Sequence, residues 1–388
     1  MKAKVILKPG KEKAIKNRHH WIFSGAIAEM SDFKDGDILP VFSSKNEQLG
    51  SAYFNRNAKI IGRMIAFDGA DPYDSLRQNL ERAFSLRSSL FQSQQTNAYR
   101  LINAEGDCLP GLIVDKYGEV LVMQISTLGM EKLRDFILEL LVRQFKPLGI
   151  FEKSLLPSRK EEKLMDRQEL LYGTIPDEIE IAENALRFLV SVKEGQKTGF
   201  FLDHREMRQL IKSLSSGKRV LNCFAYTGGF SVYAASGGAK RVDSVDISQG
   251  AMAMAKRNME LNEFNAEANF IVADVFDFLR KDALDYEVVI LDPPAFAKRQ
   301  KDVVPACRGY KDINRLAMQK MPPKTFLLTC SCSYYVDEDL FQKVLFQASV
   351  EAKRSVKIIS RHHMAADHPI NLCHPESDYL KSFLLYVE

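Results

Sequence analysis

The sequence predicts an α/β protein in three parts: a small β barrel, a small α+β domain, and a C-terminal domain built on a mostly parallel, Rossmann-like sheet. Three patterns predict this. Short β-type runs fill the first 73 residues, a hairpin and an amphipathic helix come next, and strands alternate with helices after residue 180. At 388 residues, the chain is long enough for two or three domains.

Composition is that of an ordinary globular protein. Hydrophobic residues make up 46% and charged residues 27%, which excludes a disordered or fibrous chain. No segment reaches the roughly 18 uninterrupted apolar residues that a membrane span needs, and the N-terminus lacks the apolar core of a secretory signal. We therefore expect a cytoplasmic protein without a membrane partner, whose six scattered cysteines are reduced thiols.

Residues 1–73 are expected to form the barrel. Runs such as KVILK, DILPVF and IIGRMIAF are β-rich, and KDGD at 34–37 marks a turn. The net charge is only +4, but the first twenty residues carry seven basic residues against one acid. Such a stripe suits nucleic-acid phosphates, and a solvated basic face explains it equally well. Trp21 follows the stripe; packing in the barrel is its expected role, with base stacking as the alternative.

Residues 74–180 are expected to contain a connecting helix and the small α+β domain. Leu76, Leu80 and Phe84 recur at helical spacing, which predicts a helix over about 74–100. Two β-type runs then flank a turn at 116–119, which predicts a hairpin, and GMEKLRDFILELLVRQF has the pattern of an amphipathic helix.

Residues 181–388 are expected to form the parallel-sheet domain. The runs RVLNCF, RVDSVDIS, ANFIVAD and YEVVILDPPAF alternate with helical segments, as strands of a doubly wound sheet do. Ligands of such sheets bind at the carboxyl ends of the strands. The residues that follow each run are therefore the candidates for a functional site.

The first three strand ends predict a nucleoside site without a pyrophosphate. Thr227, Gly228 and Gly229 form a tight turn whose backbone can approach a ligand, but their spacing is not the G-x-G-x-x-G of nicotinamide enzymes. Asp246, about twenty residues later, can accept both hydroxyls of a ribose, and Asp274 can meet an adenine amino group. Together they favour S-adenosylmethionine as the cofactor.

The polar segment GQKTGFFLDHR, residues 195–205, precedes the first of these strands. We expect it to close over the methionine end of the cofactor, with Phe200 and Phe201 as walls and Asp203 or Arg205 on the charged amino acid group. A plain loop leading into a helix is the alternative.

Two further strand ends supply candidates for the chemistry. Asp292 precedes Pro293 and Pro294, which stiffen the turn, so its carboxylate is expected to hold a planar base. The strand TFLLTC ends at Cys330, and Cys332 follows between two serines. A thiolate that adds to carbon 6 of cytosine makes carbon 5 nucleophilic toward a methyl sulfonium. Cys332 is the candidate for this role, whereas Cys330, beside the apolar run, is expected in the core.

Seven segments together resemble the ribosomal RNA large subunit methyltransferase I family: EGQKTGFFLDHR, VLNCFAYTGGFSVYAASGGA, SVDIS, LDPPAF, ACRGYKDINRLA, SCSYYV and AADHP. The resemblance implies a C-terminal class I methyltransferase domain, an N-terminal PUA domain, and formation of 5-methylcytosine in 23S ribosomal RNA, with Cys332 in the position of the family's cysteine. Cysteine replaces the family's bulky apolar residue at position 330. No cysteine follows the prolines, so the base that removes the carbon-5 proton is not assigned.

The expected site residues combine these arguments. Catalysis is assigned to Cys332 and Asp292. Cofactor contacts are expected from Lys197, Thr198, Phe200, Asp203, Arg205, Asn222, Phe224, Tyr226, Thr227, Gly228, Asp246, Ile247, Asp274, Val275 and Asp292. RNA contacts are expected from Lys11, Lys13, Arg18, Trp21, Arg308 and Lys311, the last two in a basic loop around Cys307. The expected partner is large-subunit ribosomal RNA, and a homodimer is one option for assembly.

No metal is expected. His362, His363, His368, Cys373 and His374 gather near the C-terminus, but their spacing matches no zinc pattern, and a substrate-facing loop is the better interpretation.

Two other functions stay open at this point. Asp-Pro-Pro followed closely by an aromatic resembles the motif of amino methyltransferases, which methylate an exocyclic nitrogen of a nucleobase without a thiol, although Ala295 intervenes here. A non-catalytic RNA-binding or ribosome-assembly factor could keep the same fold. The joint presence of Asp246, Asp292 and Cys332 speaks against that third function.

Overall fold

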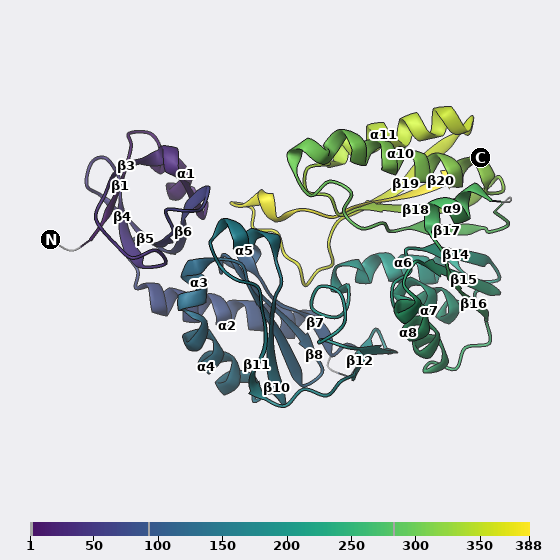
Figure 1. The fold of residues 1–388 in the computed structure, drawn as a ribbon, viewed down its shortest axis with the longest axis horizontal. Helices are drawn as coiled ribbons and strands as arrows, with labels where there is room; N and C mark the ends of the chain where they lie inside the picture. Colours follow the sequence, from purple (N-terminus) through teal and green to yellow (C-terminus); the bar gives the residue numbers. More distant parts are fainter. Residues whose placement is uncertain (1–2, 92–93, 282–283) are drawn as a thin grey trace. The chain divides into compact units, whose positions relative to one another are not determined.

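The computed structural model describes residues 3–91, 94–281 and 284–388 and separates the chain into two compact units (Figure 1). The first unit comprises Met1–Ala185, Val190–Leu202 and Ala366–Ser377, and the second comprises Leu186–Leu189, Asp203–Ala365 and Asp378–Glu388. The first unit therefore contains one segment from the middle of the chain and one from near its C-terminal end. The boundaries expected after residues 73 and 180 remain predictions.

The first unit begins with a six-stranded sheet in the order β2-β6-β5-β4-β1-β3. Its strands are β1 (Val5–Leu7), β2 (Trp21–Phe23), β3 (Ile27–Met30), β4 (Ile38–Phe42), β5 (Gln48–Phe54) and β6 (Ile60–Phe67), with α1 (Glu12–Lys16) between β1 and β2. Alternate residues such as Leu39 and Val41 are buried in one core, as strands with one covered face require. The β runs expected in this region are all present.

A five-stranded sheet in the order β11-β10-β9-β8-β7 completes most of the first unit. The elements are α2 (Pro72–Leu90), β7 (Ala98–Asn103), β8 (Leu112–Tyr117), β9 (Val120–Ile125), α3 (Leu128–Lys132), α4 (Arg134–Phe145), β10 (Gly149–Ser154), α5 (Pro157–Glu161) and β11 (Arg167–Gly173). The predicted hairpin is confirmed as β8 and β9. Helices α2, α3 and α4 pack on the sheet in one apolar core. A two-stranded sheet, β12 (Ile179–Glu183) and β13 (Leu186–Val190), leads to the second unit.

The second unit is built on a seven-stranded sheet in the order β16-β15-β14-β17-β18-β20-β19. Its strands are β14 (Arg219–Cys223), β15 (Arg241–Asp246), β16 (Glu267–Val272), β17 (Val288–Leu291), β18 (Thr325–Ser331), β19 (Val356–His362) and β20 (Lys381–Val387). The first five are parallel, and β20 runs antiparallel to both of its neighbours. The predicted mostly parallel sheet is confirmed.

Helices cover both faces of this sheet (Figure 1). They are α6 (Arg205–Leu214), α7 (Gly229–Ser236), α8 (Gln249–Glu260), α9 (Val275–Arg280), α10 (Val303–Lys320) and α11 (Glu338–Ala352). Because strand side chains alternate, Leu221 packs with α9, α10 and α11, whereas its neighbour Val220 packs with α6, α7 and α8. Across the described ranges, the helices are all too short or too polar to cross a bilayer.

One expectation about local structure is wrong. The segment around Cys307, Arg308 and Lys311 is not a loop but part of helix α10. Ala306, Tyr310 and other residues at helical spacing bury one face of α10, and this amphipathic pattern outweighs the polarity of its exposed face.

Arg87 of α2 joins several segments of the first unit through one guanidinium group. Its two terminal nitrogens donate to the Asp107 carboxylate at 2.6 and 2.7 Å, and further bonds reach the carbonyls of Arg100 (2.9 Å) and Asp367 (2.8 Å). The Arg87 and Asp107 side chains are 0% and 5% exposed. The carboxylate therefore depends on this arginine for compensation of its buried charge.

We expect Arg87→Met to lower the free energy of unfolding of the first unit by about 3–5 kcal/mol, because it leaves the Asp107 charge buried without its partner. Urea denaturation followed by the fluorescence of Trp21, the single tryptophan and a residue of the same unit, measures this. The matched control is Arg77→Met, which breaks the exposed pair with Asp74 and should cost under about 0.5 kcal/mol. Equal denaturation midpoints for the two variants would contradict the assignment.

Candidate active site

The parallel strands of the second unit bring their carboxyl ends to one edge of the sheet. Cys223 at the end of β14 is in register with Val245 of β15 and Leu291 of β17, and Leu291 is in register with Thr329 of β18. The chain order reverses between β14 and β17, which makes this edge the topological switch point where ligands of such sheets bind. The ends of these strands and the loops that follow them contain several of the expected site residues, among them Asp246, Asp292 and Cys332.

The loop after β14 has an unusual backbone. Phe224 and Tyr226 adopt left-handed conformations with φ of 59° and 47°, and Gly228 follows with φ of 80°. Left-handed conformations are costly for residues with a side chain and concentrate at functional sites. Asp246 at the end of β15 holds this loop, because its two carboxylate oxygens accept from the backbone N–H groups of Tyr226 (3.0 Å) and Ser248 (2.9 Å).

Gly228 is required for two reasons. Its positive φ disfavours a side chain, and a Cβ built there would lie 2.9 Å from the Cβ of Ala255 in α8. The turn before α7 can therefore pack this closely against α8 only because residue 228 is a glycine. The sequence predicted that the backbone at Gly228 lies close to a ligand. In the structure, this backbone lies close to Ala255 of helix α8.

The remaining expected contacts of this edge differ in exposure. Ile247 is 71% exposed beside Asp246 and offers an apolar surface to a base, whereas Val275 is 3% exposed and belongs to the core. Asp274 caps α9 by accepting from the N–H of Asp277 at 3.1 Å. Two other expected residues take part in internal bonds: Asn222 donates to the Ser231 hydroxyl (2.9 Å), and the Thr227 carbonyl accepts from Asn258 (2.9 Å).

The segment 195–205 divides between the two units. In the first unit, the Thr198 hydroxyl donates to Asp115 at 2.6 Å, the Phe200 N–H donates to the Tyr117 hydroxyl at 3.1 Å, and the Lys197 ammonium lies 4.4 Å from the centre of the Phe201 ring. These contacts anchor the segment on the five-stranded sheet.

The end of the same segment belongs to the second unit. Asp203 is buried and accepts a hydrogen bond from the Tyr379 hydroxyl at 2.5 Å. Arg205 is also buried, at the first residue of α6. Of the expected cofactor residues in this segment, Lys197, Thr198 and Phe200 therefore belong to the first unit, and Asp203 and Arg205 belong to the second.

Sequence patterns missed a histidine beside Asp292. His204 Nε2 lies 3.3 Å from Asp292 Oδ2, and the two side chains are 4% and 19% exposed. The polar segment containing His204 was singled out, but only its aspartate and arginine were given roles. The signal that could have found it is a histidine in a segment that leads to a strand-end cluster of polar residues.

The two cysteines at the carboxyl end of β18 differ in burial. Cys330 is fully buried, as expected, and Cys332 is partly exposed just beyond the end of β18. The Cys332 sulfur lies 3.8 Å from the carbonyl oxygen of Pro293, beside the Asp-Pro-Pro turn. Burial, and secondarily the charge of Asp292, raise the pKa of the Cys330 thiol well above its usual range. Cys330 is therefore an unreactive thiol at neutral pH.

A second missed residue, Lys381, supports the turn that contains Cys332. Its buried ammonium donates to the carbonyls of Ser333 and Tyr379, both at 2.8 Å, and burial lowers its pKa. The Ser333 hydroxyl in turn accepts from the Ala297 N–H at 3.0 Å, which ties the β18 end to the Asp-Pro-Pro turn. Lys381 and Cys332 interact electrostatically, and a nearby cation favours a thiolate.

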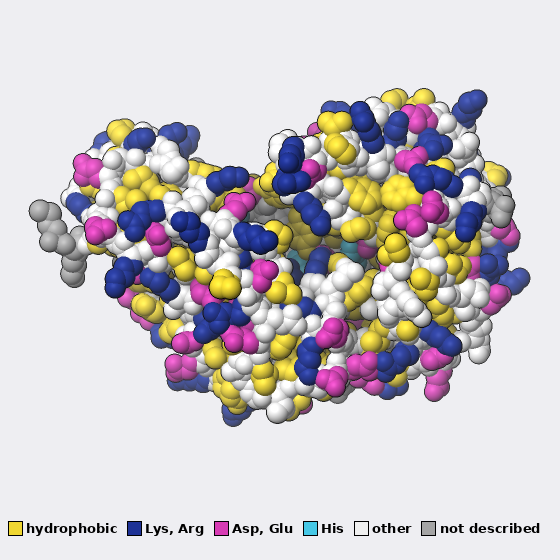
Figure 2. Space-filling view, in the orientation of Figure 1, with side chains coloured by type: hydrophobic (Ala, Val, Ile, Leu, Met, Phe, Trp, Pro, Cys, Tyr) yellow, Lys and Arg dark blue, Asp and Glu magenta, His cyan; other side chains and the backbone are white. Residues whose placement is uncertain are grey.

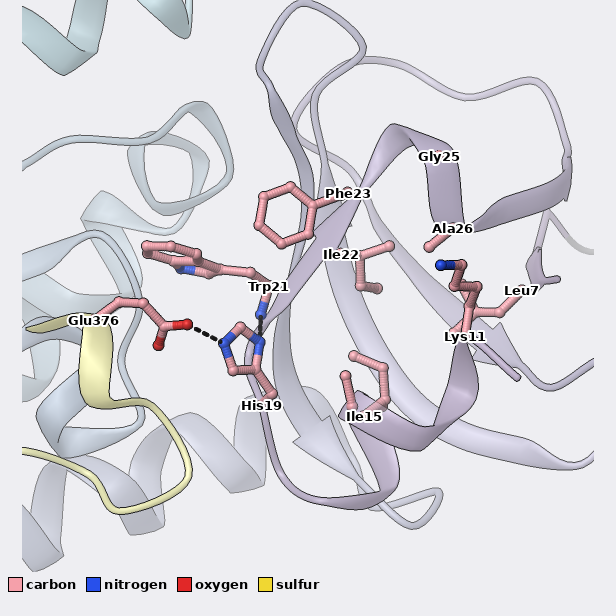
Figure 3. Close-up of a pocket in the computed structure, with 11 residues that line it drawn as sticks. Leu7, Lys11, Ile15, His19, Trp21, Ile22, Phe23, Gly25, Ala26 and Glu376 are labelled. Atoms are coloured by element: carbon pink, nitrogen blue, oxygen red, sulfur yellow. Dashed lines mark hydrogen bonds and ion pairs between the residues drawn. The ribbon is translucent and has the colours of Figure 1, made fainter. Parts of the chain in front are cut away.

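The expected RNA contacts lie in both units. Lys11 and Trp21 line one cavity of the first unit (Figure 3), and Lys13 is exposed on α1. Arg18 pairs with Asp68, and Lys311 of α10 pairs with Glu351 at 2.6 Å, so these charges are partly neutralised. Arg308 lies on α10. On the visible face of the N-terminal part, Lys and Arg side chains are dispersed among acidic and hydrophobic ones (Figure 2).

The expected packing of Trp21 inside the barrel is wrong. Trp21 is only partly buried and lies outside the core of the six-stranded sheet, and its indole N–H donates to Glu105 at 2.9 Å. Ile22, and not Trp21, occupies the core position of β2, because neighbouring residues of a strand point their side chains to opposite faces.

Two family models match separate parts of the chain. Residues 161–372 match the family model of S-adenosylmethionine-dependent methyltransferases, and residues 5–67 match a PUA-like domain. The ribosomal RNA large subunit methyltransferases I of Shewanella frigidimarina and Aliivibrio fischeri (strain MJ11) are 41% and 40% identical, over 100% and 99% of both chains. A Streptococcus mutans structure assigned as an S-adenosylmethionine-dependent methyltransferase is 25% identical with a TM-score of 0.84, and covers 99% of this chain and 100% of its own. A structure assigned as a methyltransferase and complexed with S-adenosylhomocysteine is 26% identical with a TM-score of 0.85, at the same coverage.

We expect Gly228→Ala to weaken the binding of S-adenosylhomocysteine and to destabilise the second unit by about 1–3 kcal/mol, because the new methyl group meets Ala255 and the positive φ is strained. Calorimetric titration and thermal unfolding measure the two effects. The matched control is Gly250→Ala in the first turn of α8, where a Cβ meets nothing within 4 Å. Unchanged affinity in Gly228→Ala would show that the loop does not contact the cofactor.

We also expect iodoacetamide to modify Cys332 of the native protein well before Cys330 at pH 8, because burial denies the reagent access to Cys330 and keeps its thiol protonated. Mass spectrometry with fragmentation between the two residues gives the two rates. Denaturation in urea should make the rates equal. Equal rates in the native protein would contradict the burial difference.

Proposed function

The chain belongs to the ribosomal RNA large subunit methyltransferase I family, and we propose that it forms 5-methylcytosine in 23S ribosomal RNA through a covalent adduct with Cys332. It is an S-adenosylmethionine-dependent methyltransferase of large-subunit ribosomal RNA. The observation that carries the proposal is the position of Cys332, a partly exposed thiol just after β18 and 3.8 Å from the Pro293 carbonyl.

The residues at the carboxyl edge of the sheet fit an adenosine group. The left-handed loop after β14 and the exposed Ile247 lie on either side of Asp246 in the chain and leave both backbone and apolar surface available. Asp246 would accept from the ribose, and Ile247 would cover the base. When bound, S-adenosylmethionine supplies a methyl group on a positively charged sulfur, which is open to attack by a carbon nucleophile.

Cys332 would make carbon 5 of cytosine into that nucleophile. Its thiolate adds to carbon 6, the carbon 5–carbon 6 double bond opens, and the electron pair becomes available at carbon 5. After carbon 5 has gained the methyl group, a base takes its proton, the double bond re-forms, and the carbon 6–sulfur bond breaks to release the thiolate. Lys381, buried nearby, would favour the thiolate before addition and after release.

Asp292 would hold the cytosine. Its carboxylate can accept from the 4-amino group and from the N–H of ring nitrogen 3, after that nitrogen has taken a proton from water during addition. His204, 3.3 Å from the carboxylate and buried, would fix its direction, and Pro293 and Pro294 limit the movement of the turn. The proton on ring nitrogen 3 would neutralise the negative charge that addition places on the ring, and Asp292 would hold that N–H in place.

RNA binding would use unpaired positive charges of the first unit. Lys16 is paired with Glu47 and Arg18 with Asp68, whereas neither Lys11 nor Lys13 has a carboxylate partner in the described part of the chain. These two lysines are therefore the better candidates for phosphate contacts.

The proposal predicts that wild-type protein transfers labelled methyl from S-adenosylmethionine to unmodified large-subunit ribosomal RNA and yields 5-methylcytidine on nucleoside analysis. Cys332→Ala should reduce the rate by at least about a thousandfold, because carbon 5 is then not activated. Cys330→Ala is the matched control and should retain the product, since Cys330 lies in the core.

RNA containing 5-fluorocytidine gives a second readout. Fluorine replaces the proton that must leave carbon 5, so wild type should form an adduct that survives denaturation, whereas Cys332→Ala should not. Methylation by Cys332→Ala at an exocyclic nitrogen would instead favour the amino methyltransferase. Unimpaired RNA binding without any methyl transfer by wild type would favour a binding factor.

A further inference from the structure

A cavity of about 430 Å³ opens beside strand β2 of the first unit (Figure 3). Its lining is mostly apolar, with polar groups at the margins: Leu7, Lys11, Ala14, Ile15, His19, Trp21, Ile22, Phe23, Gly25, Ala26 and Glu376. This volume falls within the range of small-molecule sites, roughly 300–1,000 Å³. All of its residues belong to the first unit, so the cavity shares no residue with the strand-end site of the second unit.

Two aromatic side chains form one wall of this cavity. Trp21 and Phe23 occupy alternate positions of β2, so they project from the same face of the strand, with ring centres 6.3 Å apart and ring planes at 85° to each other (Figure 3). Phe23 is 52% exposed, so its ring is open to a ligand. Exposed aromatic rings of this kind stack with unpaired nucleobases.

Opposite charges stand at the two sides of the cavity. Lys11 lies on one side and Glu376 on the other (Figure 3). His19 Nδ1 accepts from the Trp21 N–H at 3.2 Å, so the proton of the neutral ring is on Nε2, which donates to Glu376 at 3.1 Å. Burial opposes ionisation of Glu376, but bonds from its own backbone N–H and from His19 outweigh burial and lower its pKa. The cavity thus offers a fixed carboxylate acceptor.

A metal ion is a poor occupant of the same cluster. His19, His374 and Glu376 have ligand atoms within 4.8 Å of one another. A metal would require a bare Nε2 on His19, with the proton moved to Nδ1, but Nδ1 already accepts from the Trp21 backbone. The backbone bond therefore selects the tautomer that donates to Glu376.

We propose that this cavity binds one unstacked base of the RNA substrate. The base stacks on the exposed ring of Phe23, meets Trp21 with its edge and donates an N–H to Glu376, and the adjoining phosphates contact Lys11 and Lys13. The charge pattern supports a nucleotide. Lys11 can bind the phosphate, and the Glu376 carboxylate can accept a hydrogen bond from an N–H group on the edge of the base. The inference rests on the proposed function in taking the ligand to be RNA.

Trp21 is the only tryptophan of the chain and reports directly on this cavity. The full-length protein, without cofactor, is titrated with a single-stranded RNA hexamer, and in parallel with an abasic hexamer of the same ribose-phosphate backbone. The RNA should quench Trp21 fluorescence as it binds, and the abasic chain should bind more weakly and leave the fluorescence unchanged. Equal quenching by the two would overturn the proposal in favour of phosphate binding alone.

Variants test the two sides of the cavity. Phe23→Ala should weaken RNA binding by roughly fivefold to a hundredfold, since stacking on one aromatic contributes about 1–3 kcal/mol. Lys11→Ala should reduce the slope of log affinity against log salt by about one. Tyr73→Ala, at an exposed aromatic of the same unit, and Lys16→Ala, at a lysine already paired with Glu47, are the matched controls.

Thermal unfolding confirms that the variants are folded before affinities are compared. Equal affinities for Phe23→Ala and Tyr73→Ala would overturn the proposal. Methyl transfer is assayed separately, so the two conclusions can fail independently. If 5-methylcytidine forms but no base-dependent quenching occurs, the cavity inference is wrong; if quenching occurs without methyl transfer, the proposed chemistry is wrong and base binding stands.

Discussion

The parallel alignment of β14, β15, β16, β17 and β18 is the constraint on which the second unit depends. Parallel strands joined by helices bury both faces of the sheet, so their apolar side chains form two cores and leave no face for a polar ligand. Only the strand ends can present polar groups. Since all five strands run the same way, their carboxyl ends meet at one edge, and Asp246, Asp292 and Cys332 emerge there from segments far apart in the sequence. The candidate site is a consequence of this alignment.

Small differences in depth then decide which side chains can react. Cys330 and Cys332 are two residues apart, yet one is in the core and the other just beyond the strand. Buried polar partners limit the movement of the groups around Cys332: His204 lies against Asp292, and Lys381 supports the turn through backbone carbonyls. Such groups are costly to bury without partners, so each contact stabilises the local structure and also orients the site.

The first unit shows that the number of basic residues is a poor measure of the charge available to RNA. Lys16 and Arg18 belong to the stripe of positive charge, but carboxylates neutralise them. Lys11 has no carboxylate partner among the described residues and lies at the margin of an aromatic cavity. The cavity is completed by Glu376, which comes from nearly the other end of the chain and is oriented by a histidine whose tautomer the backbone selects. Local charge balance, rather than composition, identifies this surface.

The sequence by itself determined the elements and the edge of the sheet where a site must lie, because hydrophobic periodicity and strand-end residues are local properties. It also distinguished the two cysteines: Cys330, which directly follows the apolar run, was expected in the core, and Cys332 was expected to be the reactive thiol. It misassigned α10 as a loop, since polar residues on one face hid the buried face that includes Tyr310. Only the tertiary structure placed His204 beside Asp292, Lys381 beneath the Cys332 turn, and Glu376 beside Trp21. These contacts join residues that are tens to hundreds of positions apart, and folding alone decides which of them meet.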